Sequence, residues 1–81
     1  MMKVFLDYRV DYLAEIESNT FDEEGTAIFS DIFYKDLTAF NDEEACRIAR
    51  RRFCFSSVNP YGEKTTCELK AIYRKGVVSN V

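Results

Sequence analysis

The sequence predicts an α+β fold in which one helix packs on one face of a three-stranded antiparallel sheet. Three observations lead to this prediction: an alternating apolar and polar stretch near the N-terminus, a capped amphipathic helix in the middle, and a second alternating stretch near the C-terminus. The elements follow one another as β-β-α-β. The spatial order of the strands is 2-1-3, because the helix lets the third strand return beside the first.

The first strand is predicted over Lys3–Glu17, where apolar and charged residues alternate. The even positions form one apolar face: Val4, Leu6, Tyr8, Val10, Tyr12, Ala14 and Ile16. Period-two alternation with β-branched and aromatic residues is typical of a strand with one buried face. We expect the helix to pack on the part of this face that presents Tyr8, Val10 and Tyr12. Such a strand is about 45 Å long, so we also expect a bend or bulge within it.

The next two segments complete a hairpin. Ser18–Gly25 predicts a turn, in which Gly25 is free to adopt a positive φ angle. The segment Thr26–Phe40 is compatible with a strand or, from the spacing of its apolar residues, with one wide face of a helix. We favour the strand, because the first strand needs a neighbour for its backbone hydrogen bonds.

A helix is predicted over Asn41–Phe53. Asn41 is the N-cap, Glu44 stands at the capping-box position, and acidic residues fill the first turn. The buried stripe comprises Ala45, Ile48, Ala49 and Phe53. Arg52 falls within that stripe. Either the helix loosens before it, or its side chain reaches solvent or a carboxylate on the sheet.

The remainder predicts a loop and a final strand. Ser56–Lys64 is expected to be a loop built on a β-turn at Asn59-Pro60-Tyr61-Gly62. Thr65–Arg74 alternates again and predicts the third strand. Residues 76–81 are expected to form a frayed tail. With 81 residues, the whole chain is expected to be a single domain.

Composition argues against several functional classes. The chain has no histidine, its three glycines are isolated, and its cysteines (Cys46, Cys54 and Cys67) fit neither a disulfide framework nor a zinc pattern. We therefore expect no enzymatic activity and no metal or other cofactor. No apolar run approaches the roughly 18 residues of a membrane span, and no signal peptide is visible, so we expect a cytoplasmic protein.

Charge is segregated along the chain. Residues 1–44 hold twelve acidic and three basic side chains, a net charge of −9, whereas residues 45–81 carry eight basic and two acidic side chains, a net charge of +6. The two halves combine to the net charge of −3. This division suggests a protein that binds its partner through complementary electrostatic fields.

The acidic half supplies the leading candidate surface. Acidic residues project from one face of the first strand and crowd the turn, and neighbouring same-face residues on a strand are about 7 Å apart, close to the phosphate spacing of a nucleic-acid strand. The apolar residues Phe5 and Leu13 interrupt this face, which favours a protein partner. The predicted partner-binding residues are Phe5, Asp7, Asp11, Glu15, Asp22, Glu23 and Glu24.

Two other interpretations remain open. Basic side chains on the helix face opposite the buried stripe, together with the last strand, form an alternative nucleic-acid-binding surface that comprises Arg47, Arg50, Arg51 and Arg74. A homodimeric regulatory protein is the third interpretation. In that case the acidic hairpin of one copy meets the arginines of another, or a free sheet edge accepts a further strand.

The helix segment also carries a resemblance. The run Asp42-Glu43-Glu44-Ala45-Cys46-Arg47-Ile48-Ala49-Arg50, placed between a hairpin and one returning strand, resembles small phage-encoded proteins that disarm bacterial defences, such as anti-CRISPR proteins of type I systems. The resemblance covers Phe40–Phe53 and otherwise rests on size and element order. It implies a non-enzymatic inhibitor that lies on a nucleic-acid-binding surface of a host complex. The leading hypothesis is therefore an inhibitor or modulator of a host protein or nucleoprotein complex.

Overall fold

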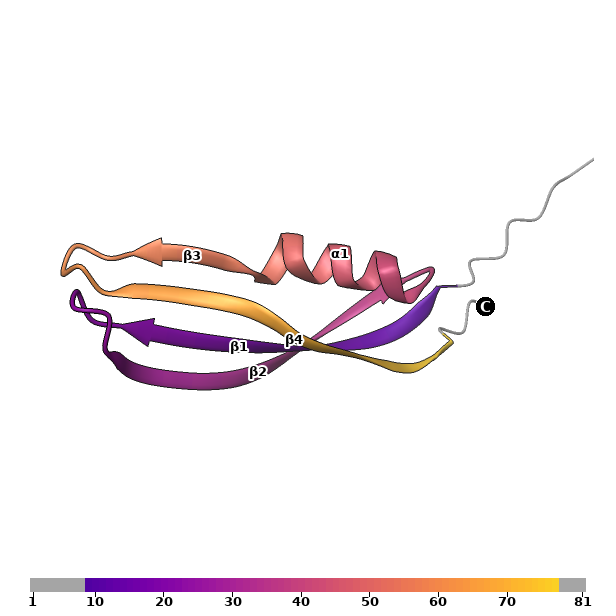
Figure 1. Ribbon diagram of the computed structural model, residues 1–81. Helices are drawn as coiled ribbons and strands as arrows, with labels where there is room; N and C mark the ends of the chain where they lie inside the picture. The colour runs from indigo at the N-terminus through magenta and orange to yellow at the C-terminus, as the bar shows by residue number, and fades with distance from the viewer. Residues whose placement is uncertain (1–8, 78–81) are drawn as a thin grey trace, which may run out of the picture.

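The computed structural model describes residues 9–77, which form a four-stranded antiparallel sheet and one helix. The elements in chain order are β1 (Val10–Phe21), β2 (Ala27–Ala39), α1 (Asp42–Phe53), β3 (Phe55–Val58) and β4 (Lys64–Val77). The strand order is β2-β1-β4-β3. Figure 1 shows an elongated molecule in which the long strands β2, β1 and β4 run side by side, while α1 and β3 follow each other in line above them.

The predicted arrangement of the long strands is confirmed, but the predicted number of strands is wrong. The first strand lies between the second and the last, as expected, and a fourth strand, β3, occupies part of the predicted loop Ser56–Lys64. β3 pairs with β4 from Phe55↔Cys67 to Val58↔Lys64. Its four residues are too few to show a period, so only the pairing with β4 reveals the strand.

The boundaries of the hairpin also differ from the prediction. β1 continues through Ser18 to Phe21, within the predicted turn, because β2 and β4 both supply hydrogen-bonding partners to this end of β1. β2 is a strand, so the helical alternative for this segment is wrong. Residues 3–8 of the predicted first strand, including Tyr8, lie outside the described residues. Of the predicted tail, Gly76 and Val77 belong to β4, and residues 78–81 lie outside the described part.

The core lies between α1 and one face of the sheet. The side chains of Val10, Tyr12, Ala14 and Ile16 alternate into it along β1, as the sequence predicts. The helix contributes Ala45 and Ala49, with Ile48 and Phe53 packed at the margin. Small side chains at the contact bring the helix close to the sheet. Arg52 is exposed and the helix continues to Phe53, so the helix does not loosen before this residue.

The helix covers only part of this face. By register, Phe29 on β2 and Phe55 on β3 share the face of the buried β1 residues. Phe29 and Phe55 are nevertheless 61% and 55% exposed. Figure 1 shows that β3 and the neighbouring end of β2 extend beyond α1. The sheet therefore has one end packed under the helix and one end that is open on both faces (Figure 1).

The predicted N-cap is confirmed. Asn41 Oδ1 accepts a hydrogen bond from the backbone N–H of Glu44 (2.8 Å), and Glu44 Oε1 accepts one from the backbone N–H of Phe40 (3.0 Å). In a capping box the second bond reaches the N-cap residue itself, whereas here it reaches the residue before it. These two bonds join the end of β2 to the start of α1.

We predict that Asn41→Ala lowers the free energy of unfolding by about 1 kcal/mol, because the substitution leaves the Glu44 N–H without its acceptor. Asn41→Asp keeps an acceptor at this position and serves as the control. Urea denaturation followed by circular dichroism measures both variants. Equal midpoints for Asn41→Ala and the wild type would contradict a role for this cap.

Candidate functional site

The turn between β1 and β2 is built around Asp22. Its Oδ1 accepts hydrogen bonds from the backbone N–H groups of Glu24 (2.9 Å) and Thr26 (2.8 Å). Gly25 adopts φ 88°, as the sequence suggests, and its N–H donates to the Asp22 carbonyl oxygen (2.9 Å). The carboxylate of Asp22 therefore holds the turn, while the side chains of Glu23 and Glu24 remain exposed.

The turn between β3 and β4 uses the same device. Asn59 Oδ1 accepts hydrogen bonds from the backbone N–H groups of Tyr61 (2.9 Å) and Glu63 (3.0 Å). Gly62 adopts φ 82° and donates its N–H to the Asn59 carbonyl oxygen (3.0 Å), which confirms the predicted β-turn. The side chain of Tyr61 is 81% exposed at the tip of this turn.

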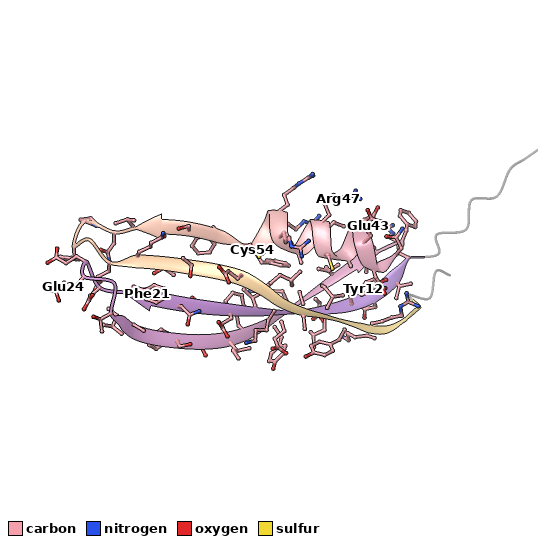
Figure 2. All side chains as sticks on the ribbon, viewed as in Figure 1. Tyr12, Phe21, Glu24, Glu43, Arg47 and Cys54 are labelled. Atoms are coloured by element: carbon pink, nitrogen blue, oxygen red, sulfur yellow. The ribbon has the colours of Figure 1, made fainter. Side chains whose placement is uncertain are left out.

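The two turns lie next to each other at the end of the sheet that α1 does not cover (Figure 1). A Cβ atom added to Gly62 would lie 3.1 Å from the Cβ of Glu23, so the turns touch at this point. Figure 2 shows Glu24 at the outer tip of the first turn. We call this surface the distal end, and it comprises Glu23, Glu24, Val58, Pro60 and Tyr61.

Of the distal end, the sequence predicted Glu23 and Glu24 as partner-binding residues but did not predict Tyr61 as one. The predicted β-turn includes Tyr61 without giving its side chain a role. An aromatic residue between proline and glycine at a turn tip cannot reach the core, and this signal is present in the sequence. The predicted antiparallel pairing of the first and last strands already places the two turns at the same end of the sheet, whereas β3, which leads into the second turn, was not predicted.

The acidic residues of β1 are compensated within the sheet. Lys75 Nζ lies 3.7 Å from Asp11 Oδ2 and 2.9 Å from Asp36 Oδ1. Tyr73 Oη donates a hydrogen bond to Glu15 Oε1 (2.8 Å), and Lys70 Nζ donates one to Glu17 Oε2 (3.0 Å). The predicted acidic row is therefore a mixed network on the face opposite α1.

Two bulges in β4 produce this compensation. The register between β1 and β4 shifts between Asp11 and Tyr12 and again between Glu15 and Ile16, which leaves Lys75 and Lys70 without partners in β1. Each bulge turns its lysine toward the acids of β1. We expected a bend or bulge within the first strand. The bulges lie in the pairing of this strand with β4, and the extra residue of each bulge belongs to β4. Hydrogen bonds from Asn19 and then from Lys70 lower the pKa of Glu17.

The predicted arginine surface divides into two parts. Arg47, Arg50 and Arg51 are exposed on α1 and form what we call the arginine face; Figure 2 shows Arg47 on the outer side of the helix. Arg47 lies 3.9 Å from Glu43, one helical turn away. Arg74, on β4, instead donates a hydrogen bond to Asp42 Oδ1 (2.7 Å), so its charge is compensated at the start of the helix.

Tyr12, Asp42 and Arg74 form a cluster that ties α1 to the sheet. The hydroxyl of the buried Tyr12 donates a hydrogen bond to Asp42 Oδ1 (2.6 Å), and the guanidinium of Arg74 lies 6.0 Å from the centre of the Tyr12 ring. Burial, followed by the bond to Asp42, raises the pKa of Tyr12. The hydrogen bonds from Tyr12 and Arg74 lower the pKa of Asp42. The cluster thus satisfies the one polar atom of the Tyr12 side chain.

The cysteines assemble no chemical site with other side chains that the structure describes. Phe5 and Asp7 lie outside the described residues. Cys46, Cys54 and Cys67 are free thiols, and burial raises the pKa of Cys54. Within residues 9–77 there is no pocket and no group of metal-ligating side chains. In the same part of the chain, no helix has the length and apolar character needed to cross a membrane.

We predict that the stability of the protein falls on acidification partly through Asp42. Because the pKa of Asp42 is lowered in the folded state, the unfolded chain takes up its proton first, and the stabilisation is lost as pH falls below about 4. Asp42→Asn should lower stability at neutral pH and flatten its decline between about pH 5 and pH 2. Glu43→Gln, which removes a charge from the same helical turn but leaves the cluster intact, is the control. Parallel pH profiles for Asp42→Asn and the wild type would contradict this role.

Comparisons of the chain with models of known protein families, with curated proteins and with solved structures found no match.

Proposed function

We propose that the protein acts by binding, as an inhibitor or modulator of the kind that phages and mobile elements direct at a host protein complex. The distal end is its contact surface. The observation that carries this proposal is the position of Tyr61, 81% exposed on a turn that touches the acidic turn of β1 and β2. An exposed aromatic side chain beside uncompensated carboxylates is a composition suited to recognition of a protein.

Preorganisation of the two turns supports this assignment. Each turn is fixed by a side-chain oxygen that accepts two backbone N–H groups, from Asp22 in one turn and Asn59 in the other. Tyrosine loses little conformational entropy on binding because it has only two side-chain torsions. A tyrosine on a turn that is already ordered therefore contributes contact area at a low entropic cost.

Charge on the distal end specifies the kind of partner. Glu23 and Glu24 are exposed, whereas the acids of β1 bind lysine or tyrosine side chains. A partner with a basic, partly apolar surface complements this arrangement, and the nucleic-acid-binding surface of a bacterial defence complex has that chemistry. The resemblance of the helix segment to anti-defence proteins agrees with this proposal. A cytoplasmic place of action follows from it.

We predict that Glu23→Lys/Glu24→Lys/Tyr61→Ala abolishes partner binding and leaves the fold intact, because none of these side chains holds its turn. Asp22 is left unchanged, since its carboxylate accepts two turn hydrogen bonds. The tagged protein is used to recover partners from nuclease-treated bacterial lysate at low salt, with mass-spectrometric quantification. The triple variant should recover the host complex at least about tenfold less efficiently than the wild type.

The matched control is Glu43→Lys/Glu68→Lys, which reverses two exposed acids away from the distal end. It should recover the complex as the wild type does. Equal recovery by the triple variant and the wild type would refute the distal end as the contact surface. Loss of recovery by the control alone would place the contact at Glu43 on α1 or at Glu68 on β4.

The arginine face supports a second candidate function, the binding of nucleic acid. Arg47, Arg50 and Arg51 lie together on the exposed side of α1, separate from the acidic distal end. Arg74 no longer belongs to this surface, because Asp42 compensates its charge.

For this second function we predict that Arg47→Ala/Arg50→Ala/Arg51→Ala removes binding to DNA or RNA in a gel-shift assay at low salt. Wild-type binding should weaken steeply with salt, and the slope of that dependence should fall by about one for each arginine that no longer binds a phosphate. Arg74→Ala, which changes a compensated charge, should have a smaller effect. Absence of any shift for the wild-type protein with both nucleic acids would rule this function out.

A further inference from the structure

The outer edge of β2 is a long strand edge with exposed apolar side chains. β2 pairs with β1 on one side only and forms one margin of the sheet, in the part of the chain that the structure describes. Its exposed large apolar residues are Ile28, Phe29, Ile32 and Tyr34. A long edge of this kind presents unpaired backbone N–H and C=O groups to another strand.

One hydrogen bond shows which backbone groups face outward. The N–H of Ile32 donates to Oδ1 of the preceding residue, Asp31 (2.9 Å), so this N–H points away from β1. Since hydrogen-bonding directions alternate along an antiparallel strand, the N–H groups of Ser30, Tyr34 and Asp36 also face the free edge. A partner strand must place its own outward-facing groups opposite these residues.

We propose that β2 pairs antiparallel with β2 of a second copy of the chain, with Phe33 opposite Phe33 of the second copy. This register brings Ile32 opposite Tyr34 of the second copy, so that outward-facing residues exchange their hydrogen bonds. Two four-stranded sheets then join as one eight-stranded sheet. The interface is separate from the distal end, so this proposal does not rest on the proposed function.

Charge selects this register. With Phe33 on the two-fold axis, Asp31 lies opposite Lys35 of the second copy, and the pair occurs twice. Moving the strands by two residues in either direction keeps the backbone groups in phase but places Phe33 opposite one of these charges instead. Lys35 Nζ lies 5.6 Å from the centre of the Phe33 ring, so its charge already lies beside the proposed axis.

Apolar side chains agree with the same register on both faces. On the face opposite α1, Ile32 and Tyr34, which are 44% and 54% exposed, meet their counterparts in a cluster of four side chains. On the other face, Phe29 lies opposite Leu37 of the second copy, which α1 of that copy helps to bury. The open end of one sheet thus lies next to the helix-covered end of the other.

The same charges explain why the edge does not accept an arbitrary strand. Asp31 and Lys35 stand on the face that contains the core residues of β1, and charges placed there oppose pairing with an apolar strand. A second copy neutralises both charges, because it presents them in the reverse order. A foreign strand would need a lysine and an aspartate at the same four-residue spacing.

The test is sedimentation velocity of the full chain from about 1 to about 200 μM in low salt. The wild type should reach twice the 9.4 kDa mass of one chain as its concentration rises. Asp31→Lys alone and Lys35→Asp alone should each raise the dissociation constant of the dimer by about tenfold, because each substitution places like charges opposite one another twice. Asp31→Lys/Lys35→Asp restores opposite charges and should restore the dimer.

Glu68→Lys is the matched control: it changes net charge as Asp31→Lys does but lies on the interior strand β4, and it should leave the dimer unchanged. Circular dichroism checks that each variant keeps the wild-type fold. A wild-type mass of one chain at every concentration would overturn the proposal and assign Asp31 and Lys35 to protection of the edge. Failure of the folded double variant to recover the dimer would overturn the register.

Discussion

The contact between Tyr12 and the first turn of α1 is the interaction on which the rest of the structure depends. Tyr12 is the largest fully buried side chain together with Ile16, and its hydroxyl reaches Asp42 across the junction between sheet and helix. Its position brings the start of α1 over β1, and Arg74 closes the cluster from β4. Since α1 begins there and ends at Phe53, β3 can only lie beside the part of β4 beyond the helix. The division of the sheet into a covered and an open end follows.

Much of the fold could be predicted from the sequence, because the signals concerned are local. Alternation along Val10–Ile16 identified the buried face of β1, and Asn41 with Glu44 identified the start of α1. β3 could not be predicted, because Phe55–Val58 is too short to carry a period and is a strand only by virtue of β4. The bulges at Lys70 and Lys75 were equally hidden, since a bulge is a property of two paired strands.

The candidate site was less predictable than the fold, because contacts between distant residues decide which charges remain available. Asp22 is a predicted partner contact, and its carboxylate also accepts the hydrogen bonds that hold the turn. Arg74 belongs to the predicted alternative nucleic-acid surface, and its guanidinium donates a hydrogen bond to Asp42, 32 positions earlier in the chain. Glu23 and Glu24 remain as predicted, exposed at a turn tip. A count of charges along a sequence therefore overestimates the surface that is free to bind.

The segregation of charge along the chain has a different meaning in the folded protein. Antiparallel pairing of β1 with β4 places the acidic first half directly beside the basic second half, and the bulges at Lys70 and Lys75 direct two lysines onto that acidic face. Exposed ion pairs of this kind add little stability, because water and salt screen them. Their larger effect is to cancel the electrostatic field of the acidic side chains on the sheet face opposite α1. In the part of the chain that the structure describes, exposed charge therefore remains on separate surfaces, among them the acidic distal end, the arginine face of α1 and the edge of β2 with Asp31 and Lys35.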